Sequence, residues 1–222
     1  INEGETLGVV GESGCGKSTL GRVVLKLIEP TDGRIYYRGQ DITDLKGKSF
    51  AELRKKMQIV FQDPYSSLNP RLCVSELIAD PLKANRMLDR RSRQEKVYEL
   101  MDMVGLSRRF AFSYPHELDG GRRQRIGIAR ALVLDPDFIV CDEPVSALDV
   151  SIQAQILNLL QDLQQQRNLT YIFVTHDLSV VRHISTNIMV MYVGVVVEKC
   201  EAKELFKMPL HPYTKGLLSA IP

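Results

Sequence analysis

The chain has 222 residues, which is the length of one domain with a subdomain or of two small domains. Hydrophobic residues make up 44% of the chain and charged residues 25%, so the composition is that of a globular protein and excludes a disordered one. The 29 basic residues exceed the 27 acidic residues by only two, and this balance provides no overall positive field for a nucleic acid.

The apolar runs and the cysteines exclude further classes of protein. The longest apolar run, 188–197, is about half of the roughly 20 residues that a transmembrane helix needs, and the first residues lack the pattern of a signal peptide. Cys15, Cys73, Cys141 and Cys200 lie far apart, without the spacing of a zinc site. We therefore expect reduced thiols in a cytosolic protein.

The pattern of hydrophobic and turn-forming residues predicts alternating strands and helices. In chain order, the first elements expected are a strand at 5–10, a helix at 17–28, a strand at 34–37, a loop with a short helix at 41–55 and a strand at 57–61. A mostly helical insert over 64–135, punctuated by prolines and containing one distinct helix at 91–104, comes next. The remaining elements expected are a strand at 138–141, a helix at 151–167, strands at 170–174, 188–192 and 195–199, and helical structure in the last twenty residues.

Two of these segments indicate how the elements pack. The continuous apolar run at 138–141 is typical of a parallel strand that helices cover on both faces. The helix at 151–167 carries a row of apolar residues on one face, namely Ile152, Ile156, Leu159, Leu160 and Leu163. We therefore predict an α/β fold with a mostly parallel sheet flanked by helices.

A phosphate-binding loop is the most specific motif in the chain. Residues 11–19, GESGCGKST, fit the pattern G-x-x-x-x-G-K-[ST] and lie between the first strand and the first helix, a context that disfavours a chance match by a glycine-rich turn. The glycines allow backbone N–H groups to face phosphates, and the helix N-terminus adds a partial positive charge. Lys17 is expected to reach the β- and γ-phosphates, and Ser18 to bind Mg²⁺. Cys15 occupies a free position of the pattern, and we assign its side chain no role.

Polar residues also follow two later strands directly in the sequence. Asp142 and Glu143 follow the strand at 138–141, where Asp142 can join the Mg²⁺ shell and Glu143 can orient or deprotonate a water molecule. His176 follows the strand at 170–174, and at the ligand-binding edge of the same sheet it is expected to contact the γ-phosphate. The alternatives are an acidic turn after a core strand and a structural histidine.

In this order and over the whole chain, the motifs resemble those of the ATP-binding cassette (ABC) ATPases. Gln62 matches the Q-loop of the family, and residues 118–122 lie at its signature motif. Glu143 matches the catalytic glutamate, residues 146–149 the D-loop and His176 the switch histidine. Each motif is short, but together with a complete phosphate loop they are very specific.

The resemblance implies a P-loop NTPase that hydrolyses ATP with Mg²⁺, in which each signature covers the nucleotide of a second ATPase domain. The implied catalytic residues are Glu143, His176 and Gln62, and the implied metal ligands are Ser18, Gln62 and Asp142. The implied nucleotide-binding positions are Gly11, Ser13, Gly14, Cys15, Gly16, Lys17, Ser18, Thr19, Asp119, Gly120, Gly121 and Asp149. The chain would be a single ABC ATPase domain, with a RecA-like core at 1–63 and 136–222 and a helical signature subdomain at 64–135.

Four segments are similar to those of dipeptide and oligopeptide importer ATPases, namely 61–70, 114–117, 149–155 and 211–214. The ATPases of nickel and glutathione importers are similar to much of these segments, so the resemblance does not identify the cargo. It implies partners in the membrane (transmembrane permease subunits), a second ABC ATPase subunit and, indirectly, an extracytoplasmic substrate-binding protein, with no nucleic acid. The expected location is the cytoplasmic face of the cell membrane.

The signature departs from the family, because Asp119 and Arg122 replace the usual serine and glutamine. An ionised Asp119 cannot donate a hydrogen bond to a γ-phosphate, and two unit charges about 4 Å apart repel by roughly 4 kcal/mol at an effective dielectric near 20. We therefore expect impaired dimer closure, although Arg122 could pair with Asp119. The alternative is that Asp119 only caps the helix that begins there.

Two other functions stay open on the sequence alone. One is a nucleotide-binding subunit whose hydrolysis is impaired by the altered signature. The other is a soluble ABC ATPase that acts on DNA or ribosomes, although no sustained heptad run of a coiled coil is visible. In the family, an aromatic residue on strands before the phosphate-loop strand stacks on adenine, and because this chain starts at Ile1 we assign no such residue.

Overall fold

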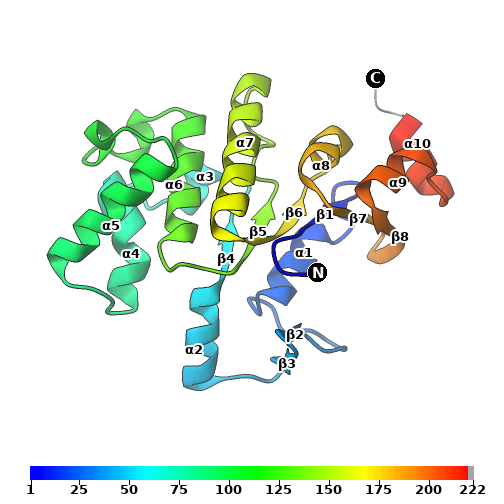
Figure 1. Cartoon of the computed structure of the whole chain (residues 1–222), viewed down its shortest axis with the longest axis horizontal. Helices are drawn as coiled ribbons and strands as arrows, with labels where there is room; N and C mark the ends of the chain where they lie inside the picture. Colours follow the sequence, from blue (N-terminus) through cyan, green and yellow to red (C-terminus); the bar gives the residue numbers. More distant parts are fainter. Residues whose placement is uncertain (220–222) are drawn as a thin grey trace.

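The computed structural model describes residues 1–219 and is built around a six-stranded sheet in the order β4-β5-β6-β1-β7-β8 (Figure 1). Its strands are β4 (Met57–Val60), β5 (Phe138–Asp142), β6 (Thr170–Val174), β1 (Thr6–Val10), β7 (Asn187–Tyr192) and β8 (Val195–Glu201). Neighbouring strands from β4 to β7 are parallel, and β8 returns antiparallel beside β7. The predicted α/β fold with a mostly parallel sheet is therefore confirmed.

The register of the parallel strands aligns their carboxyl ends at one edge of the sheet. Val9 of β1 and Asp142 of β5 both pair with Val174 of β6. Val60 of β4 pairs with Cys141, the residue before Asp142. The loops that follow these strands therefore start side by side, at the edge where open α/β sheets bind ligands.

Helices cover both faces of the sheet because the side chains of β5 and β6 alternate between two apolar clusters. The even-numbered apolar residues of both strands pack with helix α1 (Lys17–Val24). The odd-numbered ones pack with α7 (Val150–Arg167) and α8 (Leu178–Ile184), on the opposite face. Both strands are buried along their whole length, as the continuous apolar run at 138–141 predicts.

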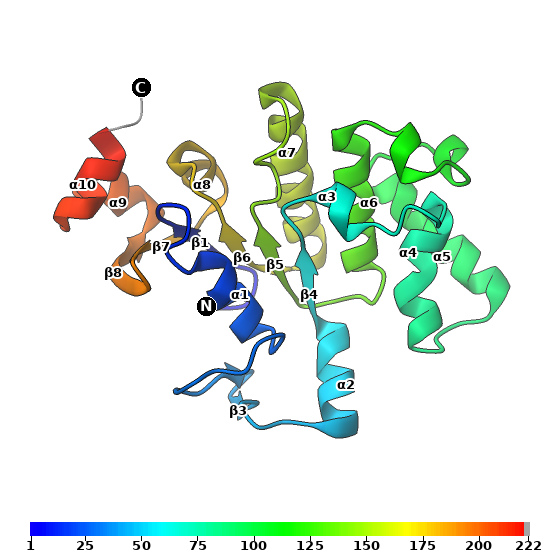
Figure 2. The ribbon, with the colours of Figure 1, turned by 180° about the vertical axis from the view of Figure 1, so that it is seen from behind.

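A group of helices lies beside the edge strand β4 (Figure 2). It contains α3 (Pro64–Ser67), α4 (Val74–Ala84), α5 (Arg90–Met103), α6 (Gly120–Leu132) and the short turns η1 (Arg108–Phe110) and η2 (Pro115–Glu117). Residues 64–135 are therefore mostly helical, as expected. Their apolar side chains belong to the same cluster as those of α7 and the odd-numbered sheet residues, so one hydrophobic core extends from the sheet into these helices.

The structure corrects three details of the sequence expectations. The helix expected at 17–28 ends at Val24, because Lys26 adopts a positive φ of 53° and the N–H of Leu27 bonds back to the carbonyl of Arg22. The strand expected at 34–37 is reduced to the two residues of β2 (Tyr36–Tyr37), which pair with β3 (Gln40–Asp41). Pro81 is one of the prolines expected to punctuate the insert, but it lies inside α4 and does not end this helix. The neighbouring Leu82 is buried.

The other ends of the elements agree with the expectations to within a few residues. Helix α2 (Gly47–Lys56) is the short helix expected before β4, whereas α8 has no counterpart among them. The helical structure expected in the last twenty residues consists of α9 (Ala202–Lys207) and α10 (Pro212–Ser219), and residues 220–222 lie outside the described part. Within residues 1–219, none of the helices has both the length and the apolar character needed to cross a bilayer.

A substitution at Ile156 on α7 tests the packing between this helix and the sheet, because the side chain of Ile156 is fully buried in the larger apolar cluster. We expect Ile156→Ala to lower the free energy of unfolding by about 2–5 kcal/mol, as for other cavity-forming substitutions. Val150→Ala is the control, since Val150 lies on the same helix with 82% of its surface exposed and should cost less than about 0.5 kcal/mol. Urea unfolding measures both, and equal losses would show that this face of α7 is not part of the core.

Candidate active site

A cavity of about 660 Å³ opens at the carboxyl edge of the sheet. Its walls come from four loops that follow parallel strands. The loop after β1 and the start of α1 contribute residues 11–19 except Cys15, which is buried, and Gln62, Glu143 and His176 follow β4, β5 and β6. Leu217 of α10 completes the wall. The structure therefore brings together the phosphate loop and the three catalytic residues that the sequence predicts.

The backbone of the phosphate loop requires its glycines. Gly14 and Gly16 have φ values of 81° and 100°, in a region that residues with a Cβ rarely adopt. Gly11 lies against β7, and a Cβ added there would be 2.1 Å from the carbonyl oxygen of Met191. Helix α1 then begins at Lys17 without a side-chain cap, so the first N–H groups of the helix stay available to an anion.

Lys17 places a positive charge inside this loop. Its side chain is almost fully buried, with 4% of the residue exposed. Its ammonium Nζ donates hydrogen bonds to the carbonyl oxygens of Gly11 and Glu12, each at 2.8 Å. Such bonds offset the cost of burying the charge, and they hold the ammonium inside the loop, at the wall of the cavity.

Ser18, the residue after Lys17, lies next to Asp142, the last residue of β5, and the two side chains form a pair of possible oxygen ligands. The hydroxyl of Ser18 donates to Oδ1 of Asp142 at 2.6 Å, and Asp142 is 3% exposed. A hydroxyl and a carboxylate are oxygen ligands that Mg²⁺ accepts, and this ion usually takes its other ligands from water and substrate phosphates. The pair fits such an ion, and within residues 1–219 no cluster of three acidic, histidine or cysteine side chains forms a complete metal site.

Glu143 joins Gln62 and His176 into one hydrogen-bonded group. Nε2 of Gln62 donates to Oε2 of Glu143 at 2.9 Å, and Nδ1 of His176 lies 3.3 Å from the other carboxylate oxygen, Oε1. The side chain of Glu143 is 13% exposed, whereas that of His176 is 58% exposed. Glu143 also has a positive φ of 45°, which is strained for a residue of this size, and its N–H donates to the carbonyl of Val174. The carboxylate is therefore held in one position at the end of β5.

The signature and the D-loop lie against each other, away from this cavity. Asp119 is the N-cap of α6, where its carboxylate accepts the N–H of Arg122 at 2.8 Å and also pairs with the guanidinium of Arg122 at 2.8 Å. A Cβ added at Gly121 would meet the side chain of Ile152 at the start of α7, one turn after the exposed Asp149. Asp119, Gly120, Gly121 and Asp149 are not among the residues that line the cavity.

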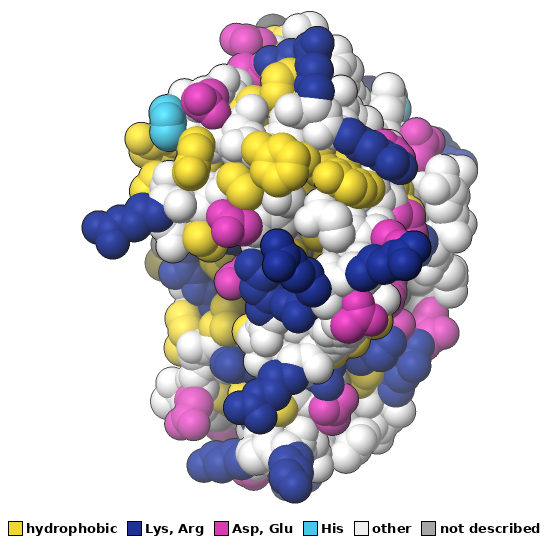
Figure 3. All heavy atoms as spheres, turned by 90° about the vertical axis from the view of Figure 1, so that its left-hand side faces the viewer, with side chains coloured by type: hydrophobic (Ala, Val, Ile, Leu, Met, Phe, Trp, Pro, Cys, Tyr) yellow, Lys and Arg dark blue, Asp and Glu magenta, His cyan; other side chains and the backbone are white. Residues whose placement is uncertain are grey.

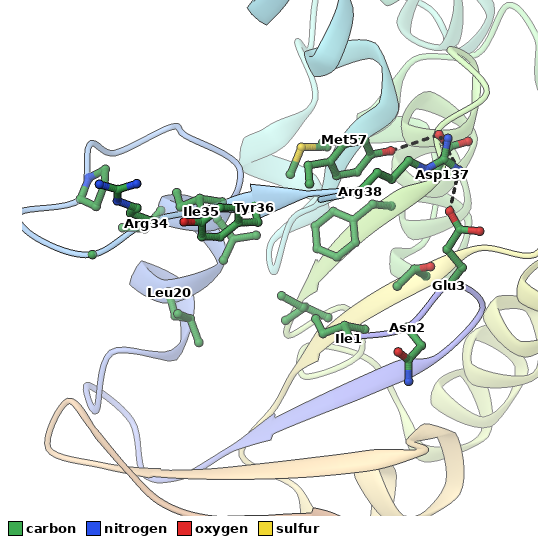
Figure 4. A pocket seen from close by; sticks show the side chains of 18 of the residues that line it. Ile1, Asn2, Glu3, Leu20, Arg34, Ile35, Tyr36, Arg38, Met57 and Asp137 are labelled. Carbon is green, nitrogen blue, oxygen red and sulfur yellow. Dashed lines mark hydrogen bonds and ion pairs between the residues drawn. The ribbon is translucent and has the colours of Figure 1, made fainter. Parts of the chain in front are cut away.

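A larger cavity of about 1070 Å³ lies at the opposite edge, beside the first residues of β4, β5 and β6 (Figure 4). Its polar groups are bound to one another. Asp137 accepts a hydrogen bond from the hydroxyl of Tyr37 and pairs with Arg38, which also pairs with Glu3. Burial and the carboxylate of Asp137 raise the pKa of Tyr37 to about 12, so the phenol stays neutral. This cavity has no phosphate loop, so the cavity at the carboxyl edge is the candidate active site.

Two residues of the C-terminal helix α10 also reach the site, and the sequence reasoning did not assign them to it. Leu217 lines the cavity, and the hydroxyl of Tyr213 accepts a hydrogen bond from the N–H of Glu12 in the phosphate loop. The only signal was the segment His211–Thr214, which served as a marker of the subfamily. A contact between residues 201 positions apart has no local pattern that would reveal it.

Comparisons with known proteins show the family of this chain. The family model described as "ABC transporter" matches residues 1–146, and the model described as "Oligopeptide/dipeptide transporter, C-terminal region" matches residues 197–222. The chain is 55% identical to "Oligopeptide transport ATP-binding protein OppF" of Bacillus subtilis (strain 168), with 100% of this chain and 73% of that protein covered. It is 54% identical to "Dipeptide transport ATP-binding protein DppF" of Haemophilus influenzae, with 100% and 68% covered.

Solved structures show the same fold. A dimeric structure of the ATP-binding cassette MJ0796, in a post-hydrolysis state bound to ADP and phosphate, matches with a TM-score of 0.81 and 33% identity over 91% of this chain and 87% of that one. The cbiO1 protein of Clostridium perfringens, part of the transporter complex cbiONQ, matches with a TM-score of 0.84 and 30% identity over 93% and 81%. Fold, site and relatives agree that the chain belongs to the ABC transporter family, as one of its ATP-binding, ATP-hydrolysing subunits.

Proposed function

We propose that this chain hydrolyses ATP at the carboxyl edge of its sheet and thereby drives an importer for peptides. The contact of Glu143 with both Gln62 and His176, beside the buried Lys17, is the observation that carries the proposal. It unites three strand ends in one group that can act on a nucleotide held by the phosphate loop. The relatives, which are described as oligopeptide and dipeptide transport ATP-binding proteins, support peptides as the cargo.

The phosphate loop and the pair of Ser18 and Asp142 hold the nucleotide and its ion. Lys17 faces the β- and γ-phosphates, and the N–H groups at the start of α1 bind phosphate oxygens. Ser18, Asp142 and Gln62 are the side chains that would hold Mg²⁺, which neutralises charge on the phosphates when it is bound with ATP. This assignment rests on the oxygen ligands that converge at these strand ends.

Glu143 acts as the general base in this proposal. Its carboxylate accepts a proton from the attacking water, while the amide of Gln62 and the ring of His176 keep both carboxylate oxygens in place. His176, whose side chain is 58% exposed and lines the cavity, is free to contact the γ-phosphate as well. A base fixed by two neighbours needs little rearrangement when the nucleotide arrives.

A second copy or a related subunit completes the site. Asp119, Gly120, Gly121 and Asp149 do not line the cavity of their own chain, although α6 and the D-loop present them together. We propose that they contact the nucleotide held by the second subunit. The dimeric arrangement of the MJ0796 cassette supports such a pairing.

The helical segment 64–135 is proposed to be a subdomain that docks on the permease subunits at the cytoplasmic face of the membrane. It contains 13 basic and 9 acidic residues, a net charge of +4, whereas the rest of the chain has a net charge of −2. The face that carries α4 and α5 shows hydrophobic side chains gathered in a band between Lys and Arg (Figure 3). Exposed Leu88 and Phe112 belong to this segment. The substrate-binding protein would act through the permeases and make no contact with this chain.

The peptide assignment is tested in vesicles that contain the chain together with its permease subunits. Peptide-loaded binding protein added on the outer side should stimulate ATP hydrolysis by this chain, and the unloaded binding protein should stimulate it less. Stimulation by nickel or by glutathione, with no response to dipeptides or oligopeptides, would assign a different cargo while leaving the ATPase function intact.

The first prediction from the proposed function concerns the general base. Glu143→Gln keeps the size and the hydrogen-bonding capacity of the side chain but removes the proton acceptor, so turnover of ATP should fall by about 10²-fold or more while ATP still binds. Phosphate release measures turnover, and calorimetry measures binding. Glu29→Gln is the control, because Glu29 is exposed in the loop after α1 and should leave turnover unchanged. Normal turnover in the Glu143 variant would mean that another group is the base.

The second prediction concerns the charge in the phosphate loop. Lys17→Ala removes the cation that faces the β- and γ-phosphates, so the affinity for ATP should fall by about tenfold or more, and the affinity for AMP should change less. Lys48→Ala, at an exposed position of α2, removes the same kind of charge far from the loop. If calorimetry gives the Lys17 variant the ATP affinity of the unmodified chain, the loop is not the phosphate site.

The third prediction separates the two roles of Asp119. Serine caps helices about as well as aspartate, so Asp119→Ser keeps the cap of α6 but removes a negative charge and supplies a donor. In a Glu143→Gln background we expect stronger dimerisation with ATP. Arg122→Gln alone should bring no gain, because it leaves the carboxylate of Asp119 without its ion-pair partner.

Sedimentation with ATP at one salt concentration measures this effect. The four proteins compared all carry Glu143→Gln, and they contain no further change, Asp119→Ser, Arg122→Gln, or both of these changes. Binding of ATP to the monomer should be the same in all four proteins, since the signature does not line its own cavity. Equally tight dimers of the unmodified and double-variant chains would show that Asp119 acts only as a helix cap.

A further inference from the structure

The C-terminal helix α10 touches the phosphate loop through one hydrogen bond. The hydroxyl oxygen of Tyr213 accepts the N–H of Glu12 at 3.0 Å, and Leu217, one turn later, lines the phosphate cavity. Both views of the molecule place α9 and α10 at the β7–β8 end of the sheet (Figures 1 and 2). The motif His211–Thr214, which the catalytic chemistry does not use, therefore lies at the edge of the nucleotide site.

The peptide group between Gly11 and Glu12 connects this hydroxyl to Lys17. The N–H of that peptide group belongs to Glu12 and bonds to Tyr213, whereas its C=O belongs to Gly11 and accepts the ammonium of Lys17 at 2.8 Å. In a planar trans peptide the N–H and the C=O point in opposite directions. Fixing the direction of the N–H therefore fixes the direction of the Gly11 carbonyl, which is one of the two carbonyls that hold the ammonium.

Tyr213 is itself held in place by contacts with its neighbours. Glu198 on β8 accepts the N–H groups of Leu210 and His211, at 2.9 and 3.0 Å, at the start of α10. The N–H of Tyr213 donates to Nδ1 of His211 at 3.1 Å, and the ring of Tyr213 packs against that of Tyr192 with 4.5 Å between ring centres. Burial raises the pKa of Tyr213, so the hydroxyl is neutral at physiological pH.

The turn between β7 and β8 holds the same loop at another point. The N–H of Gly194 in this turn donates to the carbonyl of Cys15 at 3.0 Å. The phosphate loop is thus bound to the β7–β8 hairpin in the middle of its length and to α10 near its start. Of these two contacts, only the one from Tyr213 involves a peptide group whose carbonyl accepts a hydrogen bond from Lys17.

We propose that Tyr213 is a positioning residue for the lysine of the phosphate loop. It orients the peptide group of Gly11 and Glu12 so that the ammonium of Lys17 faces the β- and γ-phosphates of ATP. The proposal rests on the role of Lys17 given under the proposed function. It adds the C-terminal helix, and the motif at its start, to the parts of the chain that determine the affinity for nucleotide.

The variant Tyr213→Phe keeps the ring and its packing on Tyr192 but removes the oxygen that accepts the N–H of Glu12. Loss of one ordinary hydrogen bond, converted at 1.4 kcal/mol per factor of ten, predicts a rise in the Kd for ATP of about three- to tenfold. The Kd for AMP, which lacks the phosphates that Lys17 faces, should stay within about twofold of its original value. The control is Tyr192→Phe, which removes the same atom from the neighbouring ring and should change neither Kd.

A double-mutant cycle with Lys17→Ala shows whether Tyr213 acts through the lysine. Calorimetric titration up to millimolar ATP measures the unmodified chain, both single variants and the double variant, and their melting temperatures establish that all four are folded. We expect Tyr213→Phe to weaken ATP binding when Lys17 is present and to have no further effect when Lys17 has been replaced.

Three outcomes would overturn the proposal. The first is an unchanged Kd for ATP in Tyr213→Phe, and the second is an equal loss of affinity for ATP and AMP. The third is the same fold-change from Tyr213→Phe with and without Lys17, which would make Tyr213 a structural residue. The single variant Lys17→Ala tests the proposed function separately, because normal ATP binding in that variant would remove the role of Lys17 itself, whatever Tyr213 does.

Discussion

The parallel register of β4, β5, β6 and β1 is the constraint on which the site depends. In a sheet covered on both faces, a shift of one residue would exchange the side chains that face α1 with those that face α7 and α8. The packing of both clusters therefore fixes the register. The register in turn places Gln62, Glu143 and His176 at neighbouring strand ends, with Glu143 within hydrogen-bond distance of the other two. The chemistry at the edge of the sheet is thus a consequence of the hydrophobic core.

The phosphate loop combines a local requirement with a tertiary one. Its glycines permit the curled backbone, and this can be understood from the loop alone. Its position, however, depends on the last strands and helix of the chain, since Gly11 lies against Met191, the carbonyl of Cys15 bonds to Gly194 and the N–H of Glu12 bonds to Tyr213. A buried ammonium needs carbonyl partners held in place, and the contact of Tyr213 with Glu12 holds the peptide group whose carbonyl, that of Gly11, is one of these partners.

Asp119 satisfies a local rule, and we propose that it also acts on a second subunit. As the N-cap of α6 it accepts an N–H and complements the positive helix end, both of which are favourable within the chain. The ion pair with Arg122 offsets part of its charge, although the side chain of Asp119 is 58% exposed and solvent screens such a pair. Under the proposed function, the uncompensated part of this charge acts in an assembly of two subunits, where we propose that the helix end meets a triphosphate.

The sequence alone determined the fold class, the phosphate loop and the residues at the strand ends, because each depends on patterns within a few residues: a continuous apolar run, glycines at fixed spacing, and polar side chains directly after a strand. The end of α1 at Val24 was not predicted, since a lysine at positive φ carries no sequence signal. Only the tertiary structure decided that Glu143 contacts Gln62 and His176, and that Tyr213 reaches Glu12. These partners lie between 33 and 201 positions apart, and they meet because strand register and helix packing bring them together.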